Sequence, residues 1–240
     1  MSFMKQNLSV IVPFYNEERF LQESVMRLIK TNIFEKIILV NDNSNDKSTE
    51  IAKMLCQKYT FIHLINLEKQ GGKGNAIKIG MEYINTSHVI IHDADLEYFP
   101  SDIPEMFEEA KTTPFSLVLG SRTIGEKVRK NRYRVTYLGN KVLTNFFSLI
   151  NFYKVSDIAS CYWLIELDIL KKLDIKEKGF AIEVEVLSKF LQTDGIIIEV
   201  PINYDGRLYS EGKKITIKDG ILIFFKIIKY SKFISFFKTR

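Results

Sequence analysis

Two carboxylates one residue apart, Asp93 and Asp95, follow directly after a short β-branched run from Val89 to Ile91. Such a run predicts a buried strand, and side chains two positions apart in extended chain lie on the same side of the backbone. We therefore expect both carboxylates to face one point, which suits Mg²⁺ or Mn²⁺ shared with substrate phosphates. Glu97 could join these ligands. The competing interpretation is that the two aspartates only form a turn with their own backbone.

The chain around this stretch alternates between strand and helix patterns. Apolar, β-branched runs predict strands at residues 8–14, 36–40, 61–66, 89–91, 116–119, 161–164 and 196–200. Apolar residues at helical spacing predict helices at 17–29, 48–59, 76–84, 102–112 and 183–193. This alternation predicts an α/β fold with a mostly parallel central sheet, helices on both faces, and ligands bound beyond the carboxyl ends of the strands.

Three polar loops fall at those carboxyl ends: residues 13–17, 41–46 and 93–97. We expect them to line one crevice. The first strand is not followed by a Gly-x-Gly-x-x-Gly motif, and Gly72-Lys73 lacks the flanking residues of a P-loop. A nucleotide held by a metal and acidic loops is the interpretation that remains.

Composition sets the class of protein. A chain of 240 residues with 46% hydrophobic residues fits one large domain, or one domain with an appendage. Cys56 and Cys161 match no metal or redox spacing, so a cytoplasmic protein with reduced thiols is expected. Met1 to Asn7 contain no apolar stretch of signal-peptide length.

The net charge of +5 is concentrated at the C-terminus, where eight Lys or Arg accompany one acid, Asp219, between Lys213 and Arg240. From Ile221 to Phe237 the chain is apolar and aromatic, but lysines recur every three residues and interrupt it too often for a transmembrane helix. This pattern predicts an amphipathic helix lying on a membrane surface, although a helix packed on the protein core would share it. The expected units are a catalytic domain, residues 1–217, and a basic interfacial segment, residues 218–240.

An ordered set of motifs extends over residues 8 to about 220. It resembles the family 2 glycosyltransferases, and within them the branch of dolichyl-phosphate mannosyltransferases and polyprenyl-phosphate glycosyltransferases. The resemblance implies a GT-A (Rossmann-like) fold, a UDP- or GDP-sugar donor, a divalent metal and inversion at the anomeric carbon. The motifs are Pro13-Phe14-Tyr15-Asn16-Glu17-Glu18, Val40-Asn41-Asp42-Asn43-Ser44, Gly71-Gly72-Lys73-Gly74-Asn75-Ala76, Asp93-Ala94-Asp95, Gly120-Ser121-Arg122 and Glu199-Val200-Pro201-Ile202.

The resemblance also implies roles for particular residues. Asp42 would hydrogen-bond the base, Arg122 would lie near the transferred group, and Arg207 and Lys213 would be cations of a mobile loop. The donor site would comprise Pro13, Tyr15, Glu17, Val40, Asp42, Lys73, Asp93, Ala94 and Asp95, and the metal ligands would be Asp93, Asp95 and Glu97. Two departures leave the donor open: Asn41 replaces the first aspartate of the usual pair, and residues 209–215 lack the Gly-x-Ser-Lys form of the mannosyltransferases.

The acceptor decides whether a general base is needed. A hydroxyl acceptor must lose a proton, for which Asp157 is the first candidate and Glu183 and Glu185 the next. Asp157 could equally cap the segment that follows it. A phosphate acceptor is already ionised, and Arg122, Arg132 and Arg134 would then form its clamp.

The leading hypothesis is a metal-dependent inverting glycosyltransferase on the cytoplasmic face of the membrane, with a lipid-linked acceptor and polyprenyl phosphate as first candidate. Its catalytic residues would be Asp157, Arg122, Arg207 and Lys213. The alternatives are a glycosyltransferase with a soluble or glycan hydroxyl acceptor, and an inactive scaffold that binds nucleotide sugars or membranes. Nucleic-acid binding is not expected, because no fold module presents the basic tail.

Overall fold

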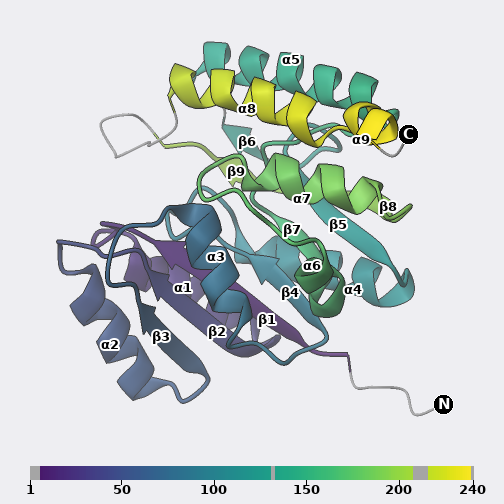
Figure 1. Cartoon of the computed structure of the whole chain (residues 1–240). Coiled ribbons are helices and arrows are strands. Elements are labelled where there is room, and N and C mark those ends of the chain that lie inside the picture. Colours follow the sequence, from purple (N-terminus) through teal and green to yellow (C-terminus); the bar gives the residue numbers. More distant parts are fainter. Residues whose placement is uncertain (1–5, 131–132, 208–215, 239–240) are drawn as a thin grey trace.

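Seven strands form the central sheet of the computed structural model, which describes residues 6–130, 133–207 and 216–238 (Figure 1). Their order is β3-β2-β1-β4-β7-β5-β8, and every neighbouring pair is parallel except the two pairs that contain β7. The predicted mostly parallel sheet is therefore confirmed. The strands are β1 (Leu8–Phe14), β2 (Phe34–Asn41), β3 (Ile62–Asn66), β4 (His88–Ile91), β5 (Ser116–Ser121), β7 (Trp163–Glu166) and β8 (Ile196–Pro201). A small second sheet pairs β6 (Arg129–Lys130) with β9 (Tyr204–Asp205).

Helices cover both faces of the sheet, as predicted (Figure 1). Side chains alternate along β1: Val10 and Val12 pack on one face with Leu21 and Val25, whereas Ile11 packs on the other with Ile77. The first face carries α1 (Leu21–Thr31), α2 (Ser48–Lys58) and the 3₁₀ turn η1 (Pro100–Asp102) followed by α4 (Ile103–Thr112). The second carries α3 (Lys73–Met81), α6 (Leu167–Lys172), α7 (Ile182–Leu191) and, further out, α5 (Arg134–Asn151), α8 (Ile217–Tyr230) and α9 (Lys232–Lys238).

Strand β7 enters the sheet between β4 and β5 and runs against both. Leu164 pairs with Ile90 on one side and with Val118 on the other, and Trp163 beside it is fully buried. The parallel halves of the sheet are thus joined through an antiparallel strand. The loops beyond β4 and β5 consequently lie apart, with the segment before β7 between them.

The C-terminal segment folds as two helices, and the first packs on the domain. Ile223 and Ile227 of α8 are buried in the same cluster as α7, and Phe224 stacks on Phe146 of α5 with ring centroids 4.7 Å apart. Thr216 caps α8 by a capping box with Asp219. The expected boundary at residue 217 coincides with the start of α8, but this helix is part of the packed structure. Within the described residues, no helix has the length and apolarity needed to span a lipid bilayer.

Candidate active site

The carboxyl ends of β1, β2 and β4 open into a cavity of about 510 Å³. All three loops that the sequence predicted to meet there contribute to its wall. The predicted site residues in the wall are Pro13, Tyr15, Glu17, Asp42, Lys73, Asp93, Ala94, Asp95, Glu97, Arg122 and Arg207. Val40 is fully buried in the core and is not part of the wall, and Lys213 lies outside the described residues.

Asp42 organises the glycine loop on one side of the cavity. Its two carboxylate oxygens accept the backbone N–H groups of Gly71, at 2.7 Å, and Gly72, at 2.8 Å. Gly72 has φ of 87°, and a Cβ there would lie 2.5 Å from the carbonyl oxygen of Lys178, so only glycine fits. Hydrogen bonding of Asp42 to a nucleobase stays a prediction. Each carboxylate oxygen has two lone pairs, so Asp42 can accept a further bond in addition to the two from the glycine loop.

The hydrogen bonds of Asn41 explain why an asparagine stands here in place of the first aspartate of the usual Asp-Asp pair. Its amide nitrogen donates to Thr49 Oγ1 at 2.9 Å and Asn66 Oδ1 at 3.0 Å, and its amide oxygen accepts the N–H of Ser44 at 2.9 Å. An aspartate could accept but not donate these bonds. Asn41 therefore fixes the loop that carries Asp42.

Lys73 opens α3 and lies between two carboxylates. Its ammonium is 2.9 Å from Asp93 and 2.7 Å from Glu183, which stands in the first turn of α7. Burial acts to lower the pKa of Lys73, but the charges of Asp93 and Glu183 outweigh it and hold this pKa well above its usual value. Burial raises the pKa of Glu183, and its Oε2 has no hydrogen-bond partner in the described part of the chain.

Arg207 contacts three further carboxylates of the cavity wall, Glu17, Asp95 and Glu97. Its Nη1 donates to Glu17 Oε2 at 3.1 Å and its Nη2 to Asp95 Oδ2 at 3.0 Å. The backbone N–H of Arg207 donates to Glu97 Oε1 at 2.8 Å, and the hydroxyl of Tyr204 donates to Glu97 Oε2 at 2.6 Å. Burial, followed by the nearby charges of Glu97 and Asp93, raises the pKa of Asp95 to about 7.

The carboxylates suit a cation that is shared with substrate phosphates. In the described parts of the chain, no three His, Cys, Asp or Glu side chains are arranged to hold a metal by themselves. Asp93 contacts Lys73, whereas Asp95 and Glu97 both lie against Arg207. The metal site of Asp93, Asp95 and Glu97 stays a prediction. Mg²⁺ and Mn²⁺ commonly bind one or two carboxylates together with substrate phosphate oxygens. The cavity wall offers such carboxylates, and a nucleotide would supply the phosphate.

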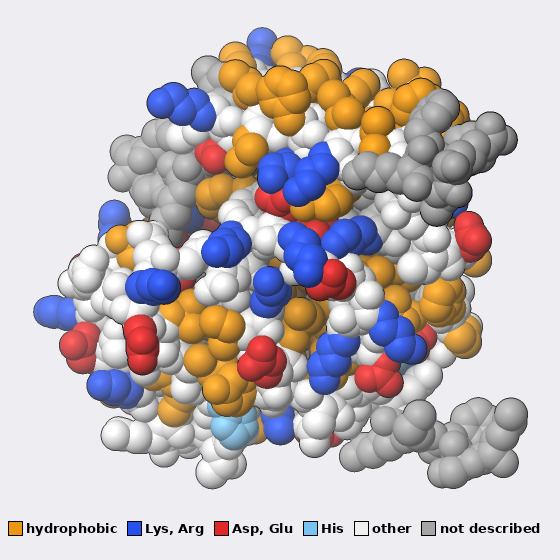
Figure 2. All heavy atoms as spheres, viewed as in Figure 1, with side chains coloured by type: hydrophobic (Ala, Val, Ile, Leu, Met, Phe, Trp, Pro, Cys, Tyr) orange, Lys and Arg blue, Asp and Glu red, His pale blue; other side chains and the backbone are white. Residues whose placement is uncertain are grey.

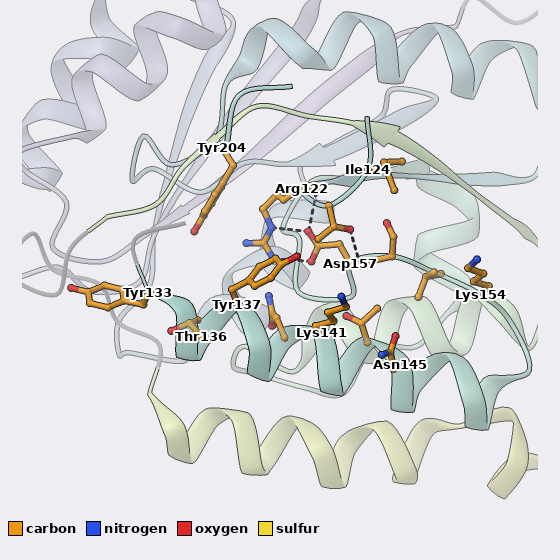
Figure 3. Close-up of a pocket in the computed structure, with 15 residues that line it drawn as sticks. Arg122, Ile124, Tyr133, Thr136, Tyr137, Lys141, Asn145, Lys154, Asp157 and Tyr204 are labelled. Atoms are coloured by element: carbon orange, nitrogen blue, oxygen red, sulfur yellow. Dashed lines mark hydrogen bonds and ion pairs between the residues drawn. The ribbon is translucent and has the colours of Figure 1, made fainter. Parts of the chain in front are cut away.

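A second cavity, of about 290 Å³, adjoins the first at Arg122 (Figure 3). Arg122 donates to Asp157 with Nε, at 2.7 Å, with Nη2, at 2.8 Å, and with its backbone N–H, at 3.0 Å. Tyr137 and Lys141 enter from α5, and Lys154 lies at the far end (Figure 3). Four residues line both cavities: Arg122, Thr136, Asn140 and Tyr204.

The three candidate bases have different surroundings. Asp157 is only 2% exposed, and both of its oxygens are bonded to Arg122. Glu185 is fully buried, bonds the backbone N–H groups of Lys176 and Glu177, and is not part of either cavity wall. Glu183 lines the larger cavity. Of the proposed clamp, Arg134 is exposed and lines neither cavity, and Arg132 lies outside the described residues.

Several residues of the site were not predicted from the sequence. The Lys73–Glu183 contact joins positions 110 residues apart (183 − 73), and no local pattern indicates it. Tyr204 lies on a two-residue strand that is not among the predicted strands. Thr136 and Asn140 belong to α5, whose apolar residues recur at helical spacing from Val135 onward and could have revealed the helix.

Residues 9–174 match the model of the family described as glycosyl transferase family 2, and the chain therefore belongs to this family. It has the GT-A fold. Over 94% of its length it superimposes on 78% of the glucosyl-3-phosphoglycerate synthase of Mycobacterium tuberculosis, solved with Mn²⁺, uridine diphosphate and phosphoglyceric acid, with a TM-score of 0.71 at 15% sequence identity.

Two curated relatives belong to the dolichyl-phosphate branch. The chain is 27% identical over 210 residues to a dolichol-phosphate mannosyltransferase of Pyrococcus furiosus, covering 86% of this chain and 58% of that one. It is 33% identical over 140 residues to a dolichyl-phosphate beta-glucosyltransferase of Trichomonas vaginalis, covering 53% of this chain and 43% of that one. The chain thus spans about half the length of these two relatives.

Proposed function

We propose that this glycosyltransferase moves a sugar, with inversion, from a UDP- or GDP-sugar to a lipid-linked phosphate, polyprenyl phosphate being the first candidate. The observation that carries the proposal is the pair of adjoining cavities. One is walled by acidic loops and the other by cationic and polar side chains, with Arg122 between them. The names of the two dolichyl-phosphate relatives support a lipid-linked acceptor.

The larger cavity is assigned to the donor. Its wall holds more carboxylates than cations, so a nucleotide diphosphate, itself an anion, needs a further cation to enter. A divalent ion, Mg²⁺ or Mn²⁺, held by Asp95 with Asp93 or Glu97, would supply this charge and stabilise the leaving diphosphate. Glu183 lines this cavity and is assigned to the sugar, from whose hydroxyl groups its carboxylate would accept hydrogen bonds.

The smaller cavity is assigned to the acceptor phosphate. Arg122, Lys141 and Lys154 supply positive charge in its wall, and guanidinium groups match phosphate geometry. A phosphate needs no general base, which agrees with the engagement of Asp157 by Arg122. We assign Asp157 the role of holding Arg122 in place.

A hydroxyl acceptor is the second candidate, favoured by Glu183. This carboxylate has an oxygen without a partner in the described chain, lies in the wall of the donor cavity and has a raised pKa because it is buried. Such a group could take the proton of an attacking hydroxyl. Transfer to a water-soluble sugar without any lipid would support this candidate.

The membrane surface is assigned to the outer side of α5 and α8. Val135 of α5 is 76% exposed and Phe225 of α8 is 61% exposed. Hydrophobic side chains gather over these two helices (Figure 2). The exposed members are Val135, Leu138, Val142, Leu149, Ile221, Leu222, Phe224 and Phe225. Lysines predicted to face anionic lipid are partly used within the protein, since Lys226 pairs with Glu177 at 2.7 Å.

The double substitution Leu138→Glu with Phe225→Glu is expected to weaken binding to anionic vesicles at least about tenfold, because both side chains are exposed and would have to enter the interface. Co-sedimentation with phosphatidylglycerol vesicles measures this. Met54→Glu with Tyr83→Glu, at similarly exposed positions on α2 and directly after α3, adds the same two charges, is the matched control and should bind like the wild type. Equal sedimentation of the double variant would contradict the assignment.

The donor is identified by thermal stabilisation. UDP, GDP and their sugars, each with Mg²⁺ or Mn²⁺, should raise the melting temperature selectively for one base, because a ligand that binds only the folded state stabilises it. The absence of any shift with every nucleotide would count against the donor site.

A further inference from the structure

Arg207 is the cation that lies against the carboxylates of Glu17, Asp95 and Glu97. It contacts two carboxylates through its two terminal nitrogens, and its side chain is only 10% exposed. Its Nε is buried without a hydrogen-bond partner in the described chain and lies 3.8 Å from Glu97 Oε1. The guanidinium therefore lies among three acids, Glu17, Asp95 and Glu97.

We infer that the Arg207 guanidinium and the divalent cation of the donor complex compete for the same carboxylates, Asp95 and Glu97. The inference rests on the proposed function, which requires such a cation. A metal ion bound by Asp95 or Glu97 would lie within a few ångströms of a guanidinium that is bonded at 3.0 Å to Asp95, and the two positive charges repel. Arg207 therefore has to leave Asp95 and Glu17 when the cation binds.

Lys73, another cation in the wall of the cavity, is held differently. It belongs to α3, and its ammonium is fixed between Asp93 and Glu183. Arg207 follows β9, a strand of two residues, and its flexible side chain can reach other partners from the same backbone position. Of these two cations, Arg207 is the one suited to exchange.

The exchange predicts an order of binding. A divalent ion alone would have to displace an arginine that contacts two carboxylates, so weak binding is expected. A nucleotide diphosphate entering with the ion offers phosphate oxygens to both the ion and the released guanidinium. Arg207 thus passes from the carboxylates to the leaving group, where its charge stabilises departure. It is a gate for the cation as well as a contact for the phosphate.

The test measures Mn²⁺ binding to the full chain by electron paramagnetic resonance of free Mn²⁺, with neither sugar nor acceptor present. Arg207→Gln is expected to bind Mn²⁺ about tenfold more tightly than the wild type without nucleotide, because one competing charge is removed. Addition of UDP or GDP should strengthen Mn²⁺ binding more in the wild type than in this variant.

Lys130→Gln is the matched control. It removes one positive charge from the neighbouring strand β6, where Lys130 is exposed and paired with Asp205 at 3.0 Å, and it should leave Mn²⁺ affinity unchanged. Arg207→Lys, which keeps the charge, should bind Mn²⁺ more weakly than Arg207→Gln. Arg207→Lys also replaces Arg207→Gln as the test variant if Arg207→Gln fails to fold. The shorter lysine loses the contacts with Glu17 and Asp95, so this variant should still bind Mn²⁺ more tightly than the wild type.

Unchanged Mn²⁺ affinity in folded Arg207→Gln, or an equal gain in Lys130→Gln, would overturn the inference. The Mn²⁺-binding assay contains no sugar and no acceptor, so its result does not depend on whether the proposed transfer reaction occurs. Conversely, active transfer together with unchanged Mn²⁺ affinity would refute the exchange alone.

Discussion

Asp95→Asn is expected to reduce sugar transfer by about three orders of magnitude, because it removes a carboxylate from the place where the diphosphate and its cation are proposed to bind. The protein should remain folded. The Asp95 carboxylate accepts the N–H of Glu97 at 3.1 Å, a bond that the asparagine oxygen can also accept. The substitution removes the bond from Arg207 to Asp95 Oδ2, but Arg207 keeps its bond to Glu17, and loss of one negative charge relieves repulsion from Glu97 and Asp93. The measurement is kcat/KM for nucleoside diphosphate release, together with a thermal melt.

Asp194→Asn is the control for this change. Asp194 has a side chain that is 92% exposed and pairs with Lys232, remote from both cavities, so its substitution should leave kcat/KM and the melting temperature at their wild-type values. Wild-type rates in Asp95→Asn would exclude this carboxylate from the chemistry.

Asp157→Asn is expected to lower both stability and activity. The side chains of Arg122 and Asp157 are 12% and 2% exposed and share two bonds, so the substitution leaves a buried guanidinium facing an amide that donates rather than accepts. Breaking one partner of a buried pair costs about 3–5 kcal/mol in the free energy of unfolding. Transfer should fall about a hundredfold, because Arg122 would lose the contact that fixes it between the two cavities. Urea denaturation and kcat/KM measure the two effects.

A double-mutant cycle with Arg122→Gln separates the two roles of Asp157. If Asp157 positions Arg122, the double variant should recover much of the lost stability, since no unpaired buried charge remains, while activity stays low. Loss of activity in Asp157→Asn at wild-type stability would instead indicate a general base.

The sequence was informative wherever a signal is local. The β-branched runs predicted the seven strands of the main sheet within a few residues, and because parallel strands end at one edge, the loops of Asp42 and Asp95 could be expected in one cavity. The apolar residues of α5 recur at helical spacing and were a local signal of the same kind, but no helix was predicted there.

Information that depends on long-range pairing was not available from the sequence. The antiparallel insertion of β7 follows from hydrogen bonds to β4 and β5, which no periodicity encodes. For the same reason the partners of the acids were missed. Asp93 and Asp95 follow one strand, yet they contact Lys73 and Arg207, two residues that are 134 positions apart in the sequence (207 − 73).

The most direct measurement is product formation by the purified protein with a panel of UDP- and GDP-sugars, Mn²⁺ or Mg²⁺, and vesicles that contain polyprenyl phosphate. We expect one donor to release its nucleoside diphosphate in step with a chloroform-soluble glycosyl phospholipid, and neither product to form without the polyprenyl phosphate. Equal turnover with a water-soluble acceptor in the absence of lipid, or no turnover with any donor, would contradict the account.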